Sequence, residues 1–285
     1  MHRRCVIGTI AVGPGRPLLV IAGPCVLEQP QTNELIGTAV RDMCAELKLS
    51  FVYKASFDKA NRSSIRSARG PGLEAGLAEL ARLRDKLGVP VTTDVHEPGQ
   101  VEAVAEVVDL LQVPAFLCRQ TDLLLECGQS GKAVNVKKGQ FMSPGEMQHV
   151  VAKLTEAGCA QIMLTERGTF FGYQRLVNDF VGLGDLMELG PAICFDVTHS
   201  TQLPGAGDGT TGGRPERAAL LARAAVAAGV DAVFLECHPN PDQAVSDVST
   251  MQPLEVMPSM LHQLAAIRSA MASQRQPSDA KTAKV

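Results

Sequence analysis

The chain has 285 residues, of which 45% are hydrophobic, so it is long enough to bury one large core without disulfide or metal staples. Its 27 basic and 30 acidic residues give a formal net charge of -3, which provides no global positive field for nucleic acid or an anionic membrane. Aromatic residues make up only 4%, which argues against base-stacking surfaces and interfacial aromatic belts. We therefore expect neither nucleic acid nor a membrane as a partner.

The eight cysteines are scattered without a Cys-X-X-Cys pair, a pattern typical of reduced thiols in the cytoplasm rather than of a disulfide framework. Basic residues precede an apolar N-terminal stretch, as in a secretion signal, but the GPGRP segment at 13–17 divides that stretch. The segment LVIAGPC at 19–25 is similar to a lipoprotein cleavage site, but Pro24 stands where a small residue must precede the cysteine. No apolar run approaches the ~18 residues of a membrane span. We expect a cytoplasmic protein.

Residues 4–12 (RCVIGTIAV) carry a weak strand pattern and are predicted to form a short β-hairpin. Short β-branched or apolar runs then recur, each followed by an amphipathic stretch of helical length. About 36 residues per unit is the size of a strand, a helix and two loops, which favours a (β/α)8 TIM barrel with the hairpin closing its bottom. The eight predicted strands are Leu18–Gly23, Phe51–Ser56, Val89–Asp94, Val108–Val113, Ala133–Lys137, Gln161–Glu166, Ala192–Val197 and Ala232–Cys237.

The predicted helices have ordinary start and stop signals. The segment SPGE at 143–146 combines an N-cap serine, a proline at the first helical position and a glutamate three residues after the serine. Gly88 and Gly229 follow amphipathic stretches and are typical C-terminal caps. Residues 273–285 have too little apolar surface to offset their ordering entropy, so we predict one barrel domain over 1–272 and a disordered tail.

A doubly wound open sheet also alternates strands and helices, so the alternation alone does not separate the two folds. The C-terminal ends of the predicted strands distinguish the two folds, because polar side chains lie at or just after nearly every one of these ends. A barrel brings all of these ends to one mouth, whereas an open sheet distributes them along an edge. We therefore predict the barrel. The residues concerned are Cys25, Lys54, Asp94, Gln112, Lys137, Lys138, Glu166, Arg167, His199, Glu236 and His238.

Four potential metal ligands are expected beyond strands one, seven and eight: Cys25, His199, Glu236 and Asp247. A thiolate, an imidazole and two carboxylates suit zinc, iron, manganese or another transition metal, and suit calcium poorly. The alternative is that Cys25 is a small buried apolar side chain and His199 a hydrogen-bonded polar residue, because these residues lie far apart in the sequence. Placing all four at one mouth favours the metal site.

Positive charge gathers at the same end of the barrel in a chain that is negative overall. Phosphate or carboxylate ligands would match this charge, although each basic residue alone is compatible with a solvated surface position. Lys54 and Lys137 lie in apolar strand contexts, where an unpaired ammonium would be costly. The basic residues are Lys54, Lys59, Arg62, Lys137, Lys138 and Arg167.

Two glycine-rich segments follow predicted strands. GAGDGTTGGRPE at 205–216 lacks the Gly-Lys-Ser ending of a P-loop and does not follow a strand directly, so we predict a loop over the mouth that leads into a helix near Pro215. RGTFFGY at 167–173 is predicted to be a tight loop whose two phenylalanines lie either in the core or on the wall of the substrate site.

From IAGPC at 21–25 to HPNPDQAVSD at 238–247, the chain resembles the 3-deoxy-D-manno-octulosonate 8-phosphate (KDO 8-phosphate) synthases, also called 2-dehydro-3-deoxyphosphooctonate aldolases. The most specific motif is KANRS at 59–63, because the sister 3-deoxy-D-arabino-heptulosonate 7-phosphate synthases usually carry a Pro-Arg-Thr-Ser motif there. Further motifs of the resemblance are TDVHEP, QVPAFLCRQTDLL, NVKKGQF, ERGTFFGY, FDVTHSTQ and FLECHP.

The resemblance implies condensation of phosphoenolpyruvate with D-arabinose 5-phosphate and water, giving KDO 8-phosphate and phosphate for lipopolysaccharide assembly. It also implies a homotetramer. One alternative is the heptulosonate synthase, which uses erythrose 4-phosphate. Another is a catalytically silent barrel that binds sugar phosphates, which we would expect to have lost Lys137, Arg167 or the KANRS motif; all three are present.

Residue by residue, the resemblance implies that Lys137 and Arg167 hold the phosphate of phosphoenolpyruvate, with Lys54 near its carboxylate. Asp94 and His199 would lie close to the reacting atoms. The other implied substrate-binding residues are Gln112, Ala115 and Phe116 beside phosphoenolpyruvate, and Lys59, Asn61, Arg62 and Ser63 around the sugar phosphate, partly at the edge of a neighbouring subunit.

The family that the chain resembles divides into metal-requiring and metal-free enzymes, and the metal-free branch has asparagine at the position of Cys25. Cys25 therefore implies the metal-requiring branch. The resemblance implies one divalent transition metal ion per subunit, held by Cys25, His199, Glu236 and Asp247.

Overall fold

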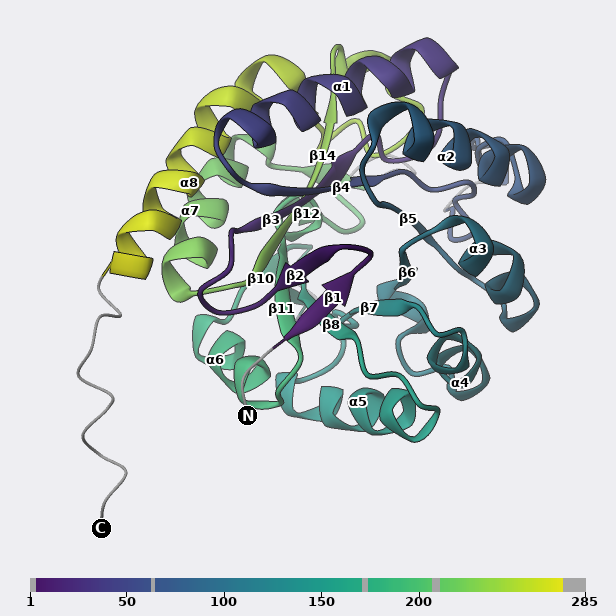
Figure 1. Ribbon diagram of the computed structural model, residues 1–285. Coiled ribbons are helices and arrows are strands. Elements are labelled where there is room, and N and C mark those ends of the chain that lie inside the picture. The colour runs from purple at the N-terminus through teal and green to yellow at the C-terminus, as the bar shows by residue number, and fades with distance from the viewer. Residues whose placement is uncertain (1–3, 63–64, 171–173, 207–210, 274–285) are drawn as a thin grey trace.

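The computed structural model describes residues 4–62, 65–170, 174–206 and 211–273, and the statements below concern these residues. Eight parallel strands form a sheet in which the last strand, β14, also pairs with β11, so that the sheet closes into a barrel (Figure 1). The predicted (β/α)8 barrel is confirmed. In hydrogen-bonded order, the strands are β11 (Ala192–Asp196), β8 (Ile162–Glu166), β7 (Ala133–Lys137), β6 (Leu110–Val113), β5 (Val91–Asp94), β4 (Ser50–Lys54), β3 (Leu19–Gly23) and β14 (Ala232–His238).

Eight α-helices surround the barrel (Figure 1). The start signal at 143–146 is confirmed, because Ser143 and Glu146 form a reciprocal capping box before α5. Gly88 and Gly229 end two helices in the left-handed conformation, as predicted. The helices are α1 (Pro30–Glu46), α2 (Leu73–Leu87), α3 (Val101–Val107), α4 (Thr121–Gln129), α5 (Met147–Glu156), α6 (Phe180–Glu188), α7 (Ala218–Ala228) and α8 (Met257–Ser273).

Short elements decorate the loops. Two pairs of short strands and one single short strand follow barrel strands: β9 (Thr169–Phe170) with β10 (Leu176–Val177), β12 (Gln202–Leu203) with β13 (Gly212–Gly213), and β15 (Gln252–Pro253) alongside the end of β14. The single 3-10 turns are η1 (Pro98–Gln100), η2 (Ala115–Leu117), η3 (Pro144–Glu146), η4 (His199–Thr201), η5 (Pro215–Arg217), η6 (Pro241–Gln243) and η7 (Leu254–Val256).

The predicted N-terminal hairpin is also confirmed. Strands β1 (Cys5–Ile7) and β2 (Ile10–Val12) pair antiparallel, and the hairpin lies across one end of the barrel in Figure 1. It packs against the inward-facing apolar residues of the lower barrel and so closes the end opposite the strand C-termini. These residues are Leu19, Ile21, Val52, Leu110, Ala133, Met163, Ala192, Cys194, Ala232 and Phe234.

Two predicted strands begin two residues later than expected. β5 starts at Val91 rather than Val89, since Pro90 has no N–H to donate and only its carbonyl bonds a neighbouring strand, through the amide of Tyr53. β6 starts at Leu110 because Val108 is the C-cap of α3. The expected strand ends elsewhere agree within two residues, so the side chains assigned to the mouth keep their places.

The loop predictions had mixed outcomes. Thr169 and Phe170 form β9 rather than a plain tight loop, and Phe170 is 44% exposed, outside both the apolar core and the cavity described below. Phe171 lies outside the described residues, as do residues 207–210 of the glycine-rich segment. A turn at Pro215 does lead into α7, as predicted.

The tail predicted over 273–285 falls on Ser273, which ends α8, and on residues 274–285, which are not described. Among the described residues, none of the helices combines the length and the apolar character needed to cross a bilayer.

Candidate active site

A cavity of about 800 Å³ opens at the C-terminal ends of the barrel strands, where loops of different βα units meet. Its size is within the range of small-molecule sites. Ser63 lies outside the described residues, and Cys25 is buried next to the lining residue Asp247. The other catalytic, substrate-binding and metal-binding residues that the resemblance implied all line this one cavity: Lys54, Lys59, Asn61, Arg62, Asp94, Gln112, Ala115, Phe116, Lys137, Arg167, His199, Glu236 and Asp247.

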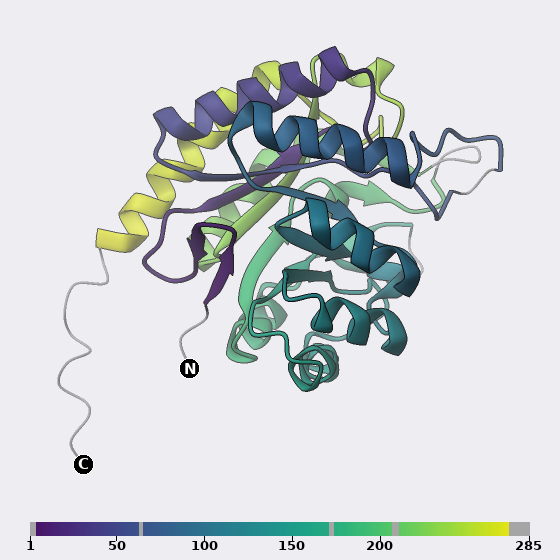
Figure 2. The same ribbon diagram turned by 45° about the vertical axis from the view of Figure 1, so that its right-hand side comes forward.

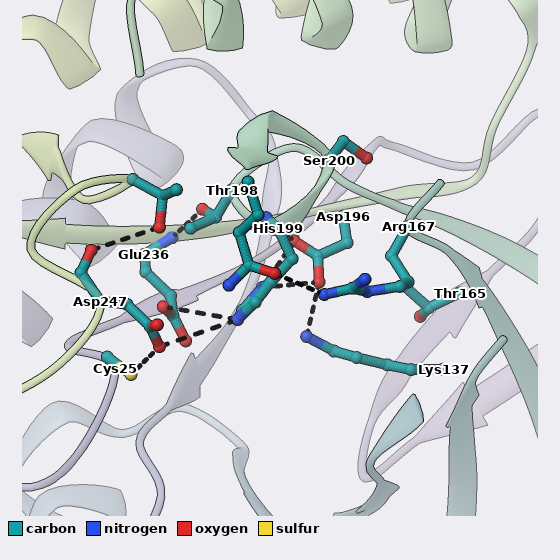
Figure 3. Close-up of polar contacts among 12 residues, drawn as sticks. Cys25, Lys137, Thr165, Arg167, Asp196, Thr198, His199, Ser200, Glu236 and Asp247 are labelled. Atoms are coloured by element: carbon teal, nitrogen blue, oxygen red, sulfur yellow. Dashed lines mark hydrogen bonds and ion pairs between the residues drawn. The ribbon is translucent and has the colours of Figure 1, made fainter. Parts of the chain in front are cut away.

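The buried carboxylate of Asp196 organises one side of the cavity (Figure 3). The ammonium of Lys137 lies 2.6 Å from Asp196 Oδ2 and 3.6 Å from the centre of the Phe234 ring. His199 Nδ1 lies 2.8 Å from the same oxygen, and the backbone N–H of His199 donates to Asp196 Oδ1. Burial opposes the charge on Asp196, but His199 and Lys137 outweigh it and hold its pKa well below the usual range. Asp196 therefore fixes both a cation and the orientation of the imidazole.

Arg167 follows β8 and lies beside Lys137 in Figure 3. Its side chain is buried, and Nη2 donates to Gln202 Oε1 at 2.7 Å. Burial lowers the pKa of Arg167, while the carboxylates of Asp196 and Glu166 oppose that shift. Two cations thus converge on one corner of the cavity, which is suited to an anionic group of a ligand.

Lys138, which the sequence placed with the other cations, does not line the cavity. Its ammonium is fully buried, donates to Met142 O and Thr169 Oγ1, and lies 3.5 Å from Glu166 Oε1. Burial lowers the pKa of Lys138. The same Glu166 oxygen accepts from the backbone N–H groups of Arg167 and Gly168. Lys138 and Glu166 therefore shape the loop that carries Arg167 rather than contacting a ligand.

Lys54 and Lys59 have different surroundings. The buried ammonium of Lys54 has three acceptors, Cys25 O at 2.9 Å, Ser56 Oγ at 2.9 Å and Glu236 Oε1 at 3.2 Å, so all three of its N–H groups are used. The ammonium of Lys59 makes no hydrogen bond or ion pair with any described residue. Burial opposes the charge on Lys59, but Cys25 and the nearby carboxylates raise its pKa well above the usual value. Lys59 is therefore a charged donor that is free for a ligand.

Arg62 lies on the segment between β4 and α2, which extends away from the barrel in Figure 2. Its Nε donates to Ala68 O at 2.8 Å and its Nη1 to Ser246 Oγ at 2.7 Å. Its Nη2 is buried and finds no hydrogen-bond partner among the described residues. A buried unpaired donor of this kind is matched by an oxygen of an anionic ligand.

Cys25, Glu236 and Asp247 form a group whose ligand atoms all lie within 4.8 Å of one another (Figure 3). His199 Nε2 lies 4.0 Å from Glu236 Oε2 and 3.9 Å from Asp247 Oδ2. Glu236 Oε2 is buried without a hydrogen-bond partner in the described part of the chain, as expected for an oxygen that awaits a cation. Because His199 Nδ1 is bonded to Asp196, its Nε2 is the nitrogen left for a metal.

The thiol of Cys25 donates to Asp247 Oδ2 at 2.7 Å. Burial, together with the charges of Asp247 and Glu236, raises the pKa of Cys25 well above its usual value. A divalent cation would take the place of the thiol proton, since thiolate is the form that binds metal. Ligands around a tetrahedral ion lie roughly 3.3–3.8 Å apart, so the observed spacing needs shifts of about 1 Å or less. The donor set therefore fits a transition metal.

Comparison with known proteins identifies the family to which the chain is similar. Residues 4–273 match the model of the DAHP synthetase I family. The chain is 54% identical over 253 residues to a protein of Alkalilimnicola ehrlichii, covering 89% of this chain and 91% of that protein. It is 52% identical over 259 residues to one of Desulfatibacillum aliphaticivorans (91% and 95% covered), and 51% identical over 263 residues to one of Cyanothece sp. (92% and 96% covered). All three are named 2-dehydro-3-deoxyphosphooctonate aldolase.

The chain belongs to the 2-dehydro-3-deoxyphosphooctonate aldolases of the DAHP synthetase I family. The resemblance identified from the motifs is confirmed. The roles that it implies for single residues stay predictions, which the geometry above makes specific for this member of the family.

Sequence reasoning missed several polar residues of this site. Asp196 had a usable signal, because a lysine inside an apolar strand, as Lys137 is, requires a buried acceptor on another strand of the barrel. Asn135 lies two residues before Lys137 on β7, so the period of two also placed it inside the barrel. Gln202 and Ser246 had no such signal, since they lie outside the eight barrel strands.

Proposed function

We propose that this protein condenses phosphoenolpyruvate with D-arabinose 5-phosphate and water, giving KDO 8-phosphate and inorganic phosphate for lipopolysaccharide assembly. The observation that carries the proposal is the pair of cationic groups in one cavity, Lys137 with Arg167 on the barrel and Lys59 with Arg62 on the segment after β4. Two phosphorylated substrates need two such groups. The relatives are named for an octonate, which favours the five-carbon sugar phosphate over erythrose 4-phosphate.

Phosphoenolpyruvate is assigned to the barrel side. Lys137 and Arg167 bind its phosphate, Lys54 lies near its carboxylate, and Gln112 lies nearby. Lys137 already points at Asp196, so a phosphate oxygen joins an existing charge pair rather than ordering a free side chain. The backbone beside Ala115 and Phe116 borders the same substrate.

The sugar phosphate is assigned to the loop side, where Lys59, Asn61, Arg62 and Ser63 hold it. The unpaired Arg62 Nη2 and the free Lys59 ammonium support this assignment. Phe116, although it lines the cavity, is 55% exposed, which is consistent with a neighbouring subunit that completes this edge in a homotetramer.

In the reaction, C3 of phosphoenolpyruvate forms a bond to the aldehyde carbon, the aldehyde oxygen gains a proton, water adds at C2, and the phosphate leaves from C2. Cations around the two phosphates hold the reacting carbons in line and offset developing charge, which can supply several kcal/mol. Asp94 and His199 lie near the reacting atoms. Burial opposes the charge on Asp94, but Lys54 and Lys59 hold its pKa well below the usual range, so it acts as a carboxylate.

We also propose one divalent transition metal ion per subunit, held by Cys25, His199, Glu236 and Asp247. When bound, the metal would polarise the aldehyde, activate water or position the sugar, and we favour positioning because relatives with asparagine in place of Cys25 resemble this chain otherwise. A single catalytic domain over 1–272 and a cytoplasmic location complete the proposal, and eight free, buried thiols support that location.

The test is consumption of phosphoenolpyruvate and release of phosphate with arabinose 5-phosphate or erythrose 4-phosphate, each with and without a chelator. We expect turnover with arabinose 5-phosphate, loss of turnover on chelation and recovery with a transition metal. Preference for erythrose 4-phosphate would replace the assigned substrate. Full activity of protein shown by elemental analysis to hold no metal would refute the metal assignment.

A further inference from the structure

Just inside the mouth, five buried polar side chains at neighbouring positions of the barrel are linked by hydrogen bonds in one unbranched row, which we call the file. Its members come from β8, β7, β6, β5 and the bridge residue after β4, and each is at most 7% exposed. In order around the barrel they are Thr165, Asn135, Gln112, Asp94 and Ser56.

The contacts are continuous. Thr165 Oγ1 donates to Asn135 Oδ1 at 2.7 Å, and Asn135 Nδ2 donates to Gln112 Oε1 at 3.4 Å. Gln112 Nε2 donates to Asp94 Oδ1, and Ser56 Oγ donates to Asp94 Oδ2 at 2.7 Å. Asp94 thus receives one donor on each carboxylate oxygen, one of them from Gln112.

The charge of Asp94 determines which group donates and which accepts in each hydrogen bond of the file. A carboxylate only accepts hydrogen bonds, so Gln112 must present its NH2 group to Asp94 and its carbonyl oxygen to Asn135. That oxygen in turn requires the NH2 group of Asn135, which leaves the Asn135 carbonyl facing Thr165, whose hydroxyl must donate. Each amide can flip in principle, but only one arrangement satisfies every partner.

Neither Asn135 nor Thr165 lines the cavity, whereas Gln112 and Asp94 do. Packing does not require polar groups at this depth, since the inward-facing neighbours Met163 and Cys194 are apolar. Buried amides and hydroxyls are costly unless they are fully hydrogen-bonded. The polar side chains of Asn135 and Thr165 are therefore explained by the side chains that they orient, not by packing.

We propose that Asn135 and Thr165 are positioning residues that fix the amide of Gln112 and, through it, the carboxylate of Asp94 in the geometry used for condensation. This inference rests on the proposed function, because it assigns a role in that reaction. It predicts a larger effect on the chemical step than on substrate capture, because neither side chain reaches a substrate and both act only through Gln112.

The first test compares Asn135→Leu and Thr165→Val with the wild type, and Thr165→Ser is the matched control that keeps the hydroxyl. We expect Asn135→Leu to lower kcat about tenfold or more with both KM values within about twofold. Thr165→Val should lower kcat less, and Thr165→Ser should restore it. A fall in thermal stability with kcat per folded molecule unchanged would reduce the file to a structural role and overturn the proposal.

The second test is a double-mutant cycle. If Asn135 acts through Gln112, then Asn135→Leu should cause no further loss of kcat in a Gln112→Leu background. Multiplicative losses would show that Asn135 acts by another route and would also overturn the proposal. Should Asn135→Leu not fold, the pair Thr165→Val and Thr165→Ser in the same background decides.

Failure of the proposed function is separately visible. A wild-type protein that is inactive with phosphoenolpyruvate and arabinose 5-phosphate would refute that function, not the file. The crystal structure of Asn135→Leu then tests the file alone: we expect the Gln112 amide to leave Asp94, and an unmoved amide would refute the positioning role.

Discussion

Replacing Lys54 and Lys59 separately by methionine should distinguish a cation that holds the structure from one that serves the ligand. Methionine keeps most of the side-chain volume, so neither change opens a large cavity. Lys54 is 1% exposed and bonds to three acceptors, including Glu236. The backbone N–H of Lys59 donates to Arg69 O, but its ammonium has no hydrogen-bond or ion-pair partner among the described residues.

The expected loss of stability follows from the contacts that each substitution leaves without a partner. Without Lys54, the carboxylate of Glu236 is buried, with Oε1 deprived of its ammonium and Oε2 already unpaired. Removing one partner of a buried ion pair costs roughly 3–5 kcal/mol. At roughly 2–4 °C per kcal/mol for a chain of this size, the unfolding midpoint should fall by roughly 10 °C. Lys59→Met should cost less stability than Lys54→Met, because the Lys59 ammonium has no direct ion pair with a described residue whose charge would be left buried and unpaired.

The assay is thermal and urea unfolding at neutral pH in the presence of a chelator, both followed by circular dichroism, with phosphoenolpyruvate consumption measured on the folded protein. We expect Lys54→Met to lose more stability than Lys59→Met, and Lys59→Met to lose activity. A Lys54→Met protein as stable as the wild type, or a Lys59→Met protein equally destabilised, would refute the division between the two lysines.

Three further predictions concern single side chains. Arg62→Ala should raise the KM for arabinose 5-phosphate far more than that for phosphoenolpyruvate, and equal increases in steady-state kinetics would contradict the loop-side assignment. Cys25→Asn should retain some activity that a chelator does not remove, whereas a folded but inactive variant would show that asparagine cannot replace the metal site here. Asp94 stays charged in the folded protein while the unfolded chain takes up a proton near pH 4, so stability present above that pH is lost as the pH falls, by up to about 1.4 kcal/mol per pH unit. Urea midpoints between pH 6 and pH 3 should therefore fall less steeply for Asp94→Asn than for the wild type, and equal slopes would argue against a charged Asp94.

The barrel could be predicted because buried parallel strands appear as short apolar runs, and their polar ends share one mouth. Strand starts were less certain, since the first residues of such a run can belong to the preceding turn, as Val89 and Val108 do. The hairpin at 4–12 was visible for the same reason as the strands, because CVI and IAV are short runs of apolar residues.

At the site, side chains borne by strands were placed well, and period two could have separated Lys138 from Lys137, because consecutive strand residues face opposite sides. The loop residue Ser246 had no strand pattern to place it. Ser246 bonds to Arg62 across 184 positions of the chain, and Asp247 next to it adopts a left-handed backbone with φ of 52°. Such a conformation is set by tertiary contacts, not by local sequence, so no pattern near Asp247 announces it.

The two sides of the cavity differ in how their charges are balanced before a ligand arrives. On the strands, Lys54 is bonded to Glu236 and Lys137 to Asp196, both buried carboxylates, so these cations are fixed and partly neutralised. A phosphate that approaches Lys137 must share it with Asp196, which limits the gain in affinity but leaves the geometry rigid. The loop-borne Arg62 instead has a buried Nη2 without a hydrogen-bond partner among the described residues, and a sugar phosphate oxygen would relieve that cost directly. The strand side is therefore built for orientation and the loop side for capture, which is why we expect losses at Arg62 to appear in KM.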